Sequence, residues 1–391
     1  MEIRGLKVVV IGAGIGGLAV ARAFAVQGAQ VTVLEQAVTI SEVGAGLQIS
    51  PNGMAVLRAL NLDGALMESS VEANFVNLHD FRGSRVLQLN LERAARSGFH
   101  FIHRADLIDV LHKGARDAGV NILLLQRVRE ISPGPTPVVF LENGATIEAD
   151  LVVGADGLHS VLRPKLNKKA QPFFTGQIAW RALIPNTTDR KNDVRVFMGP
   201  HRHMVSYPLR GGRLMNIVAV QERAAWAAES WSQRDDPMAM KAAFEDFCPE
   251  ARALLDQVND VHLWGLFRHE VAETWAKDGA ALLGDAAHPT LPFMAQGACM
   301  ALEDAWVMVD ELSKAADLNS GLQSYQRMRE TRVRKIVKTA SGNARKYHLS
   351  FPPVRSVAHM ALRLGGRIAP DLMVRQFDWI YGKDVTDPNS H

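Results

Sequence analysis

The sequence predicts a mixed α/β (α+β) fold: a Rossmann-type domain with an inserted β-sheet, followed by C-terminal helices. Three observations support this prediction. A short apolar run at residues 7–11 leads directly into a glycine-rich turn and a helical stretch, which is how a Rossmann-type unit begins. Residues 177–220 form a series of β-rich segments separated by helix-breaking residues. Residues 298–312 and 321–345 have the length of long helices.

Length and charge fit a large globular chain. The 391 residues are 47% hydrophobic, which is enough for a sizeable core, and the net charge is only +3. The densest basic stretch, residues 327–338, contains Glu330 and is interpreted as the solvated face of a long helix, so no nucleic-acid partner is expected. The apolar run at residues 8–21 is shorter than the roughly 20 residues of a membrane span. It is also interrupted by glycines, so no membrane association is expected.

The two cysteines, Cys248 and Cys299, are far apart in the sequence. They have neither the pattern of a disulfide framework nor a metal-binding spacing, so we expect no metal site. Cysteine usage of this kind favours a reducing, cytoplasmic compartment.

The N-terminal segment has the pattern of a βαβ unit. We expect a strand at residues 7–11, a helix at 15–27 and a second strand at 31–34. The motif G-x-G-x-x-G occupies residues 12–17, between the first strand and the helix. In that context the motif is typical of a dinucleotide-binding turn, in which the N–H groups of the helix N-terminus point at phosphates.

Each glycine of this motif has a separate reason. Gly12 permits the tight turn, Gly14 lets the backbone approach a pyrophosphate, and Gly17 allows the helix to pack on the strand. Glu35 ends the second strand, where its carboxylate can accept hydrogen bonds from both ribose hydroxyls. A carboxylate there also repels a 2′-phosphate, so the nucleotide is expected to be FAD or NAD rather than NADP.

Further elements are expected along the chain from propensity and turn residues. They are a helix with Asn52 as its N-cap and ending at Leu60, a helix at 104–118, a strand at 121–126, a hairpin at 138–148 turning at Asn143-Gly144, a buried strand at 151–153, a helix at 236–258 and a buried strand at 280–283.

Two more motifs directly follow expected buried strands. The first is Gly154-Ala155-Asp156-Gly157, extended by Ser160 and Arg163, and the second is Gly284-Asp285-Ala286-Ala287-His288-Pro289. An aspartate at this end of a parallel strand lies where α/β sheets bind ligands, and it can accept a hydrogen bond from a polyol hydroxyl. The alternatives are an ordinary turn for the first motif and a helix N-cap for the second.

A fourth motif, Ala295-Gln296-Gly297-Ala298, opens the helix at residues 298–312. Small residues at a helix N-terminus let backbone N–H groups face an anionic ring edge, which the helix dipole favours. Glu303 and Asp304 are interpreted as first-turn acids rather than catalysts.

These four motifs, in this order, resemble the group A flavoprotein monooxygenases, a family that includes the para-hydroxybenzoate and salicylate hydroxylases. The resemblance extends roughly over residues 6–345. It implies FAD as a tightly bound, non-covalent cofactor and NADH or NADPH as a transient one. The stretch Val43-Gly44-Ala45-Gly46-Leu47-Gln48 looks like the family's loop near the ribityl chain and flavin. By this resemblance the cofactor-binding residues are Gly12, Gly14, Gly16, Gly17, Glu35, Gln36, Gly46, Leu47, Arg104, Val128, Asp156, Asp285, Gly297 and Ala298.

Residues 296–305 look closest to one branch, with salicylate 1-hydroxylase, 3-hydroxybenzoate 6-hydroxylase and 6-hydroxynicotinate 3-monooxygenase. In that branch a histidine and a tyrosine four residues later face the substrate, and His203 and Tyr207 match them. A spacing of four places both side chains on one face of a strand. A histidine is suited to removing a phenol proton near neutral pH. The alternatives are a core or surface His-Tyr pair, and His201 as a rival base.

The resemblance implies a monooxygenase that hydroxylates a small phenolic or N-heteroaromatic acid, salicylate-like, with NAD(P)H and dioxygen through a flavin hydroperoxide. The alternatives are a same-fold FAD enzyme that performs epoxidation or double-bond reduction, and a non-catalytic dinucleotide-binding module. Ala295, Cys299 and Pro292-Phe293 depart from the family pattern, which leaves the exact substrate open.

The nucleotide-binding part is expected to come in pieces, in a monomer or a homodimer. The expected domains are residues 1–75 with 100–170 and 280–312 for FAD, residues 76–99 with 171–279 for the substrate-binding β-sheet, and residues 313–391 for the C-terminal helices.

Overall fold

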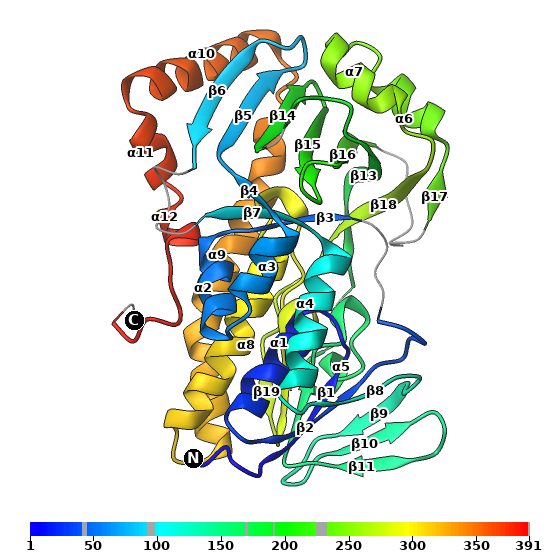
Figure 1. Ribbon diagram of the computed structural model, residues 1–391, viewed down its shortest axis with the longest axis vertical. Helices are drawn as coiled ribbons and strands as arrows, with labels where there is room; N and C mark the ends of the chain where they lie inside the picture. Colours follow the sequence, from blue (N-terminus) through cyan, green and yellow to red (C-terminus); the bar gives the residue numbers. More distant parts are fainter. Residues whose placement is uncertain (41–44, 92–97, 169–170, 191, 224–232, 390–391) are drawn as a thin grey trace.

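The computed structural model of the chain describes residues 1–40, 45–91, 98–168, 171–190, 192–223 and 233–389, and of residues 343–346 only the backbone. Within these residues the strands form a six-stranded sheet, an eight-stranded sheet and two three-stranded sheets. Figure 1 shows the six-stranded sheet in the lower half of the molecule and the eight-stranded sheet in the upper half. The long helices α8 (Gly297–Lys314) and α9 (Leu318–Tyr347) run beside them.

The six-stranded sheet has the order β19-β20-β12-β1-β2-β8, and its strands are parallel except for β19. Its strands are β1 (Lys7–Ile11), β2 (Gln30–Leu34), β8 (Asn121–Leu123), β12 (Leu151–Gly154), β19 (Ala276–Lys277) and β20 (Ala280–Leu282). The apolar strands β1 and β12 are buried. Their residues share one core with apolar residues of the helices on the sheet and with Ile131 and Val139 of a small antiparallel sheet. The strand order reverses between β1 and β12, as in a Rossmann-type sheet, so the predicted fold class is confirmed.

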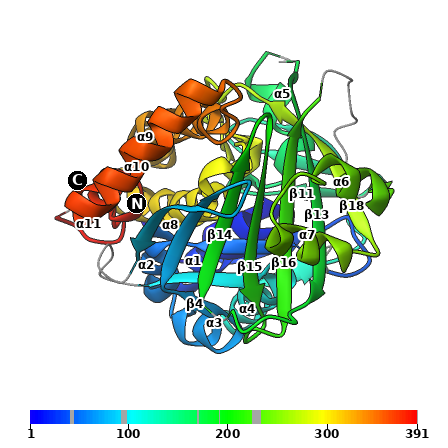
Figure 2. The same cartoon turned by 90° about the horizontal axis from the view of Figure 1, so that it is seen from above.

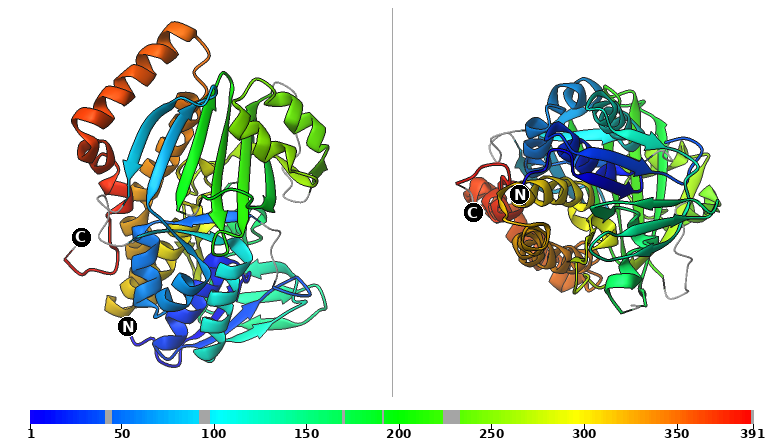
Figure 3. Two further views of the ribbon diagram at one scale, coloured as in Figure 1. Left: turned by 45° about the horizontal axis from the view of Figure 1, so that its top comes forward. Right: turned by 90° about the horizontal axis from the view of Figure 1, so that it is seen from below.

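Helices pack side by side on this sheet in an order that differs from their order in the sequence. The helix α1 (Ile15–Val26) packs against α4 (Arg104–Asp117) and against α8, which in turn packs against α9. Figure 3 shows this arrangement from below. The small antiparallel sheet of β9 (Val128–Ser132), β10 (Val138–Leu141) and β11 (Thr146–Glu148) extends from the same half, and its hairpin turns at Asn143-Gly144 as predicted.

The eight-stranded sheet has the order β17-β18-β13-β16-β15-β14-β5-β6. Its strands are β5 (Phe75–Asp80), β6 (Arg85–Asn90), β13 (Phe173–Pro185), β14 (Asp193–Gly199), β15 (Arg202–Leu209), β16 (Leu214–Glu222), β17 (Arg234–Asp235) and β18 (Val261–Arg268). The helices α6 (Pro237–Ala243) and α7 (Pro249–Asp256) cover one face through a core that includes Trp180 and Phe244. Figure 2 shows α6 and α7 at one side of the sheet and α9 and α10 (Pro352–Ile368) at the other.

Shorter elements connect the two halves. The strands β3 (Gly46–Ile49), β7 (Phe99–His103) and β4 (Val71–Ala73) form the remaining sheet, beside the helices α2 (Pro51–Ala59) and α3 (Asp63–Ser69). The helices α10 and α11 (Pro370–Arg375) pack on β6, and α12 (Asp378–Tyr381) packs on α2. The remaining described elements are the 3₁₀ turns η1 (Gly157–His159), η2 (Gly284–Ala286) and η3 (Pro292–Met294) and the helix α5 (Arg163–Leu166).

Two predicted helices differ in the structure. The helix expected at residues 236–258 is two helices, because Pro249 starts a new one at its N-terminus. The helix expected to begin at Asn52 begins at Pro51, with Ser50 at the N-cap position and Asn52 buried. No helix in the described ranges is both long enough and apolar enough to cross a membrane.

Candidate functional site

One large pocket lies between the two main sheets, with a volume of about 610 Å³. The turns that follow β1, β12 and β20 line one side, and the eight-stranded sheet lines another. The C-terminal segment contributes Phe377 and Tyr381. Doubly wound sheets bind ligands at the carboxyl ends of their strands, where the strand order reverses. The pocket is therefore the candidate functional site.

The glycine loop after β1 needs glycine for different reasons at different positions. Gly12 has a φ of +96°, and a Cβ there would lie 2.7 Å from the carbonyl oxygen of Ala155. A Cβ on Gly17 would overlap the carbonyl oxygen of Gly12. Gly14, by contrast, lines the pocket and has open space at its Cβ position. The loop thus packs tightly on the end of β12 while Gly14 leaves its backbone open to a ligand.

Glu35 holds this loop in place. Its two carboxylate oxygens accept hydrogen bonds from the backbone N–H groups of Ala13 and Ala37, each at 2.8 Å. The backbone of Gln126 donates to the carbonyl oxygen of Glu35 at 2.8 Å, which brings the chain just before β9 to the same end of the sheet. Gln36 is exposed, and Val128 is buried at the start of β9. Glu35, Gln36 and Val128 lie beyond the glycine loop, outside the lining of the pocket.

Arg104 and Asp285 bring opposite charges to the pocket wall. Arg104 begins α4, and its backbone N–H donates to the carbonyl oxygen of Ala45 at 2.9 Å. The Asp285 side chain is exposed to the pocket. Desolvation by the surrounding protein raises the pKa of Asp285, and the nearby charges of His288 and Arg104 offset part of the rise.

Asp156 has a different placement from Asp285. Its Oδ2 accepts the backbone N–H of Val161 at 2.7 Å, as in an ordinary turn, while its two sequence neighbours line the pocket. Burial raises the pKa of Asp156. Arg163, from the same motif, donates through Nη1 to the carbonyl oxygen of Ala286 at 3.1 Å. The two aspartate motifs are therefore tied to each other through Arg163.

Two helix N-termini open on the pocket. Gly297 and Ala298 line it at the start of α8, and Gly14 does so at the start of α1. In the described part of the chain no side chain caps either helix. Free N–H groups and the helix dipole favour a negatively charged group at both places.

A network of buried charges lies behind α8. Arg329 binds Oε2 of Glu303 through Nη1 at 2.6 Å and Oδ1 of Asp304 through Nε at 2.7 Å, and all three side chains are at most 1% exposed. Arg332 binds Glu303 at 2.7 Å, and Nε2 of His288 lies 2.5 Å from Oδ2 of Asp304. Because Oδ2 of Asp304 also accepts the N–H that begins η2, at 3.0 Å, the network joins α8 and α9 to the turn that carries Asp285.

Two of the sequence-based interpretations are wrong at this network. Glu303 and Asp304 are not first-turn acids of α8, because both lie in its second turn and are fully buried. The basic stretch at residues 327–338 is not simply a solvated face, because Arg329 is 1% exposed. Arg329 lies in the apolar stripe of α9, three or four residues from buried neighbours, and that spacing is the signal that the sequence contains.

The eight-stranded sheet forms the opposite wall of the pocket. His203, Val205 and Tyr207 alternate along β15 and line the pocket, while Met204 packs into the core under α6 and α7. Burial lowers the pKa of His203 well below 6.5, and the nearby His348 lowers it further, so His203 is neutral at pH 7. Burial raises the pKa of Tyr207, which keeps its hydroxyl protonated. The structure therefore brings the predicted histidine and tyrosine to one wall.

Tyr207 meets the loop at the start of β3. A Cβ on Gly46 would lie 2.7 Å from the hydroxyl oxygen of Tyr207 and 2.8 Å from Cγ of Asn216. The backbone N–H of Gly46 donates to Oδ1 of Asn216 at 2.8 Å. Leu47 lines the pocket beside Gly46, whereas residues 43–44 of the predicted loop lie outside the described residues. The two walls of the pocket thus touch at Gly46.

Arg181 adds a positive charge to the wall, and the sequence analysis did not identify it. It lies on β13, and its guanidinium carbon is 4.3 Å from the ring centroid of Trp264. Burial lowers the pKa of Arg181 to about 10, so it is charged at neutral pH. The groups that act on it electrostatically are Tyr207 and Arg104, neither of which is a carboxylate. The signal for Arg181 in the sequence was a single arginine within an apolar strand.

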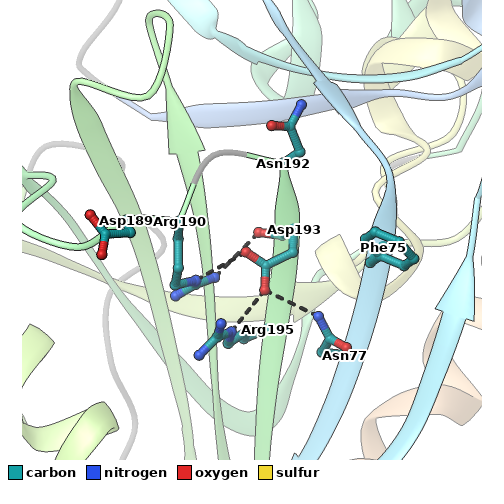
Figure 4. A pocket seen from close by; sticks show the side chains of 7 residues that line it. All are labelled: Phe75, Asn77, Asp189, Arg190, Asn192, Asp193 and Arg195. Atoms are coloured by element: carbon teal, nitrogen blue, oxygen red, sulfur yellow. Dashed lines mark hydrogen bonds and ion pairs between the residues drawn. The ribbon is translucent and has the colours of Figure 1, made fainter.

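A second hollow lies beside β5 and β14, and its charges are paired with one another (Figure 4). Arg190 and Arg195 point at Asp193, with Nε atoms 3.1 and 2.7 Å from its two carboxylate oxygens. Asn77 donates to Asp193 from β5 at 3.1 Å. Although burial alone would raise the pKa of Asp193, the two arginines lower it. We interpret this cluster as a structural tie between the two strands.

Comparisons with known proteins agree with this geometry. The chain matches the FAD binding domain family over residues 5–340. It is 33% identical to the 3-amino-4-hydroxybenzoate 2-monooxygenase PtmB3 of Streptomyces platensis, over 98% of each chain. It is also 33% identical to a 3-hydroxybenzoate 6-hydroxylase of Polaromonas naphthalenivorans, over 97% of this chain and 96% of that one. The crystal structure of Klebsiella pneumoniae HpxO with FAD and uric acid superposes with a TM-score of 0.84 at 25% identity, covering 96% and 97% of the two chains.

The chain therefore belongs to the FAD-binding family. More narrowly, it is an FAD-dependent monooxygenase of the branch that includes 3-hydroxybenzoate 6-hydroxylase, which confirms the predicted family, cofactor and enzyme class. The residues present fit the cofactor. Uncapped helix N-termini suit its phosphates and the anionic edge of its ring, and the open carboxylate of Asp285 suits its polyol chain.

Proposed function

We propose that the chain hydroxylates a small phenolic acid of the hydroxybenzoate class, with NADH or NADPH and dioxygen as co-substrates. The observation that carries this proposal is the composition of the pocket wall. A neutral histidine, a protonated tyrosine and a buried arginine face an otherwise apolar lining. Relatives at 33% identity act on 3-hydroxybenzoate and on 3-amino-4-hydroxybenzoate, which supports the same substrate class here.

Bound FAD supplies the electron transfer from NAD(P)H and the activation of dioxygen. In our proposal, Gly12, Gly14, Glu35 and the other predicted cofactor-binding residues hold it. His203 accepts the proton of the phenol, because a neutral imidazole is a base and because its ring faces the pocket. The resulting phenolate is electron-rich at the ring carbons ortho and para to its oxygen. The apolar lining excludes water from the reacting centre.

Arg181 and Tyr207 are proposed to position the substrate. A buried guanidinium is stabilised by an anionic partner, and the carboxylate of a hydroxybenzoate would supply one. The Tyr207 hydroxyl is protonated and can donate a hydrogen bond to the same ligand. We also propose the three-part domain division that the sequence predicts.

The experiment is an NADH and NADPH oxidation assay on the purified yellow protein with salicylate, 3-hydroxybenzoate, gentisate and 6-hydroxynicotinate, followed by product mass. We expect one or more of these acids to stimulate oxidation and to gain one oxygen atom. Loss of a carboxyl group with that gain would identify attack at the carboxylated carbon. Protein that binds no FAD, or a product without added oxygen, would contradict the proposal.

A pair of variants tests the assigned base. We expect His203→Ala to keep its FAD and to lose hydroxylation by about 10²-fold or more, the usual contribution of a general base. The matched control is His262→Ala, since His262 is on β18 and does not line the pocket. Equal hydroxylation by His203→Ala and the control would remove the assignment of His203.

A further inference from the structure

His203 is the inner end of a chain of hydrogen bonds that reaches the protein surface. Its Nδ1 lies 2.7 Å from Nε2 of His348, and Nδ1 of His348 lies 2.9 Å from Oε1 of Glu222. The other oxygen of Glu222 lies 2.6 Å from Nδ1 of His201. Exposure rises along this chain. His203 is 2% exposed and the side chain of His348 1%, whereas the side chains of Glu222 and His201 are 37% and 59% exposed.

Backbone contacts hold the four side chains in place. His203 lies on β15, Glu222 at the end of β16, His201 in the turn between β14 and β15, and His348 directly after α9. The N–H of His201 donates to the carbonyl oxygen of His348 at 3.3 Å. The N–H of Glu222 donates to the carbonyl oxygen of His201 at 2.8 Å. His201 has a φ of +61°, an unfavourable conformation for a histidine, which aims its ring at Glu222.

The carboxylate of Glu222 determines which ring nitrogens carry protons. A carboxylate only accepts, so Nδ1 of His348 must donate to it and Nε2 of a neutral His348 must accept. Nδ1 of His203 is then the donor to His348. The second nitrogen of His203, Nε2, is left as an acceptor, and it belongs to the ring that lines the pocket. These hydrogen bonds thus leave Nε2 of His203 ready to accept the acidic proton of a ligand.

We infer that His348 and Glu222 form a proton relay that carries the substrate's proton from His203 to the surface. This inference rests on the proposed function, because it deepens the role of the same pocket. His348 and Glu222 do not touch the substrate. They act through His203 and are therefore positioning and relay residues rather than catalytic ones.

The relay balances in protons. The phenol O–H bond breaks as Nε2 of His203 takes the proton, and Nδ1 of His203 passes its own proton to Nε2 of His348. Nδ1 of His348 then passes its proton to Glu222, which is exposed enough to lose it to water. One phenolate is formed and one proton reaches solvent. A proton that returns by the same route later in the cycle restores the original tautomers of both rings.

The electrostatic surroundings support transfer in this direction. Burial lowers the pKa of His203 and of His348, which disfavours the protonated form of both rings. Although partial burial alone would raise the pKa of Glu222, its hydrogen bonds to His201 and His348 lower it. Tyr347, whose ring centroid is 5.2 Å from that of His203, stays neutral because burial raises its pKa. The charged groups that shift the pKa values of His203, His348 and Glu222 are thus members of the relay.

The test mixes holoenzyme with 3-hydroxybenzoate in weak buffer that contains a pH indicator. It records phenolate absorbance and proton release in the same stopped-flow experiment. We expect the native protein to form phenolate and to release a proton with one shared rate constant. Glu222→Gln and His348→Ala should slow both signals by about tenfold or more, since a relay step is lost. Ligand affinity and FAD content should stay within about twofold, because neither side chain touches the ligand. Added imidazole should restore the rate in His348→Ala, which has room for that ring.

Glu250→Gln is the matched control, because Glu250 is 39% exposed and pairs with Arg195 away from the pocket. We expect it to behave as the native protein does. Native rates in both Glu222→Gln and His348→Ala would overturn the relay and leave the proposed function standing. Equal slowing in Glu250→Gln, or no rescue by imidazole, would show a general structural effect and would also overturn it. If no acid of the panel binds to the native holoenzyme, the proposed function fails and the relay fails with it.

Discussion

Replacing Asp304 with asparagine tests whether the buried charge network supports both the fold and the pocket. The amide has nearly the shape of the carboxylate, so the change removes charge rather than volume. In the native protein, Asp304 accepts from Nε of Arg329 at 2.7 Å, from Nε2 of His288 at 2.5 Å and from the N–H of Gly284 at 3.0 Å. The variant keeps Arg329 in the interior with only one of its two carboxylate partners.

The magnitude follows from that loss. Breaking a buried ion pair by removing one partner costs about 3–5 kcal/mol of unfolding free energy. With an unfolding entropy of about 2 cal/mol/K per residue, this cost lowers the Tm of a 391-residue chain by about 4–6 °C. Since Gly284 begins the turn that carries Asp285, FAD should also be held less tightly. The assay is thermal and urea denaturation of holoenzyme, together with the fraction of FAD retained after gel filtration.

Acid titration gives a second measure of the same interaction. Although burial alone would raise it, the charges of His288 and Arg329 lower the pKa of Asp304 from 3.8 to about 2. A group whose pKa is lower in the folded state stabilises the fold above its unfolded pKa. The native protein should therefore lose about 2 kcal/mol from this group as pH falls from about 4 to about 2, and the asparagine variant should not.

The control for both measurements is Asp310→Asn, on the same helix. Asp310 pairs with Lys314 at 2.6 Å in an exposed i,i+4 arrangement, which is worth about 0.5 kcal/mol or less. A Tm for Asp304→Asn within about 1 °C of the native value, with an unchanged acid profile, would refute the reasoning.

Three further predictions concern the pocket walls. Gly46→Ala places a Cβ against the Tyr207 hydroxyl and should cost about 1–3 kcal/mol of unfolding free energy, measured by urea denaturation; native stability would mean that the walls do not touch there. Asp285→Asn should weaken FAD retention, measured by fluorimetric titration of apoprotein, while leaving secondary structure unchanged by circular dichroism; unchanged FAD affinity would remove Asp285 from the cofactor site. Arg181→Met should raise KM for a hydroxybenzoate by about tenfold and leave KM for an uncharged phenol unchanged, and an equal change for both would remove the carboxylate role of Arg181.

The elements that the sequence predicted well depend on short stretches of chain. The glycine loop, the strands β1 and β12 and the helix α4 each follow from propensity, periodicity and turn residues within a few positions. The period of two along β15 likewise predicts that His203 and Tyr207 share one face, and both line the pocket. The prediction of an FAD-dependent enzyme followed from the order of such local motifs.

One group of wrong predictions depended on contacts between distant parts of the chain, and another missed a local signal. Glu303 and Asp304 have the pattern of acids near a helix start, and it is the packing of α9 on α8 that buries them against Arg329. The helix expected at residues 236–258 is divided by Pro249, a local signal that the prediction did not use.

The residues themselves predict a dinucleotide site, since a turn that cradles phosphates needs glycines at set positions whatever lies around it. FAD as the cofactor came from the resemblance of the motif order to a family. The residues also specify the parallel core and the face of β15 on which His203 lies. They do not specify the partners of that histidine. His348 is 145 residues away and comes into contact with it only because the end of α9 packs against the turn before β15. Such proximity depends on the packing of the whole chain, because no propensity within either segment encodes its distance from the other.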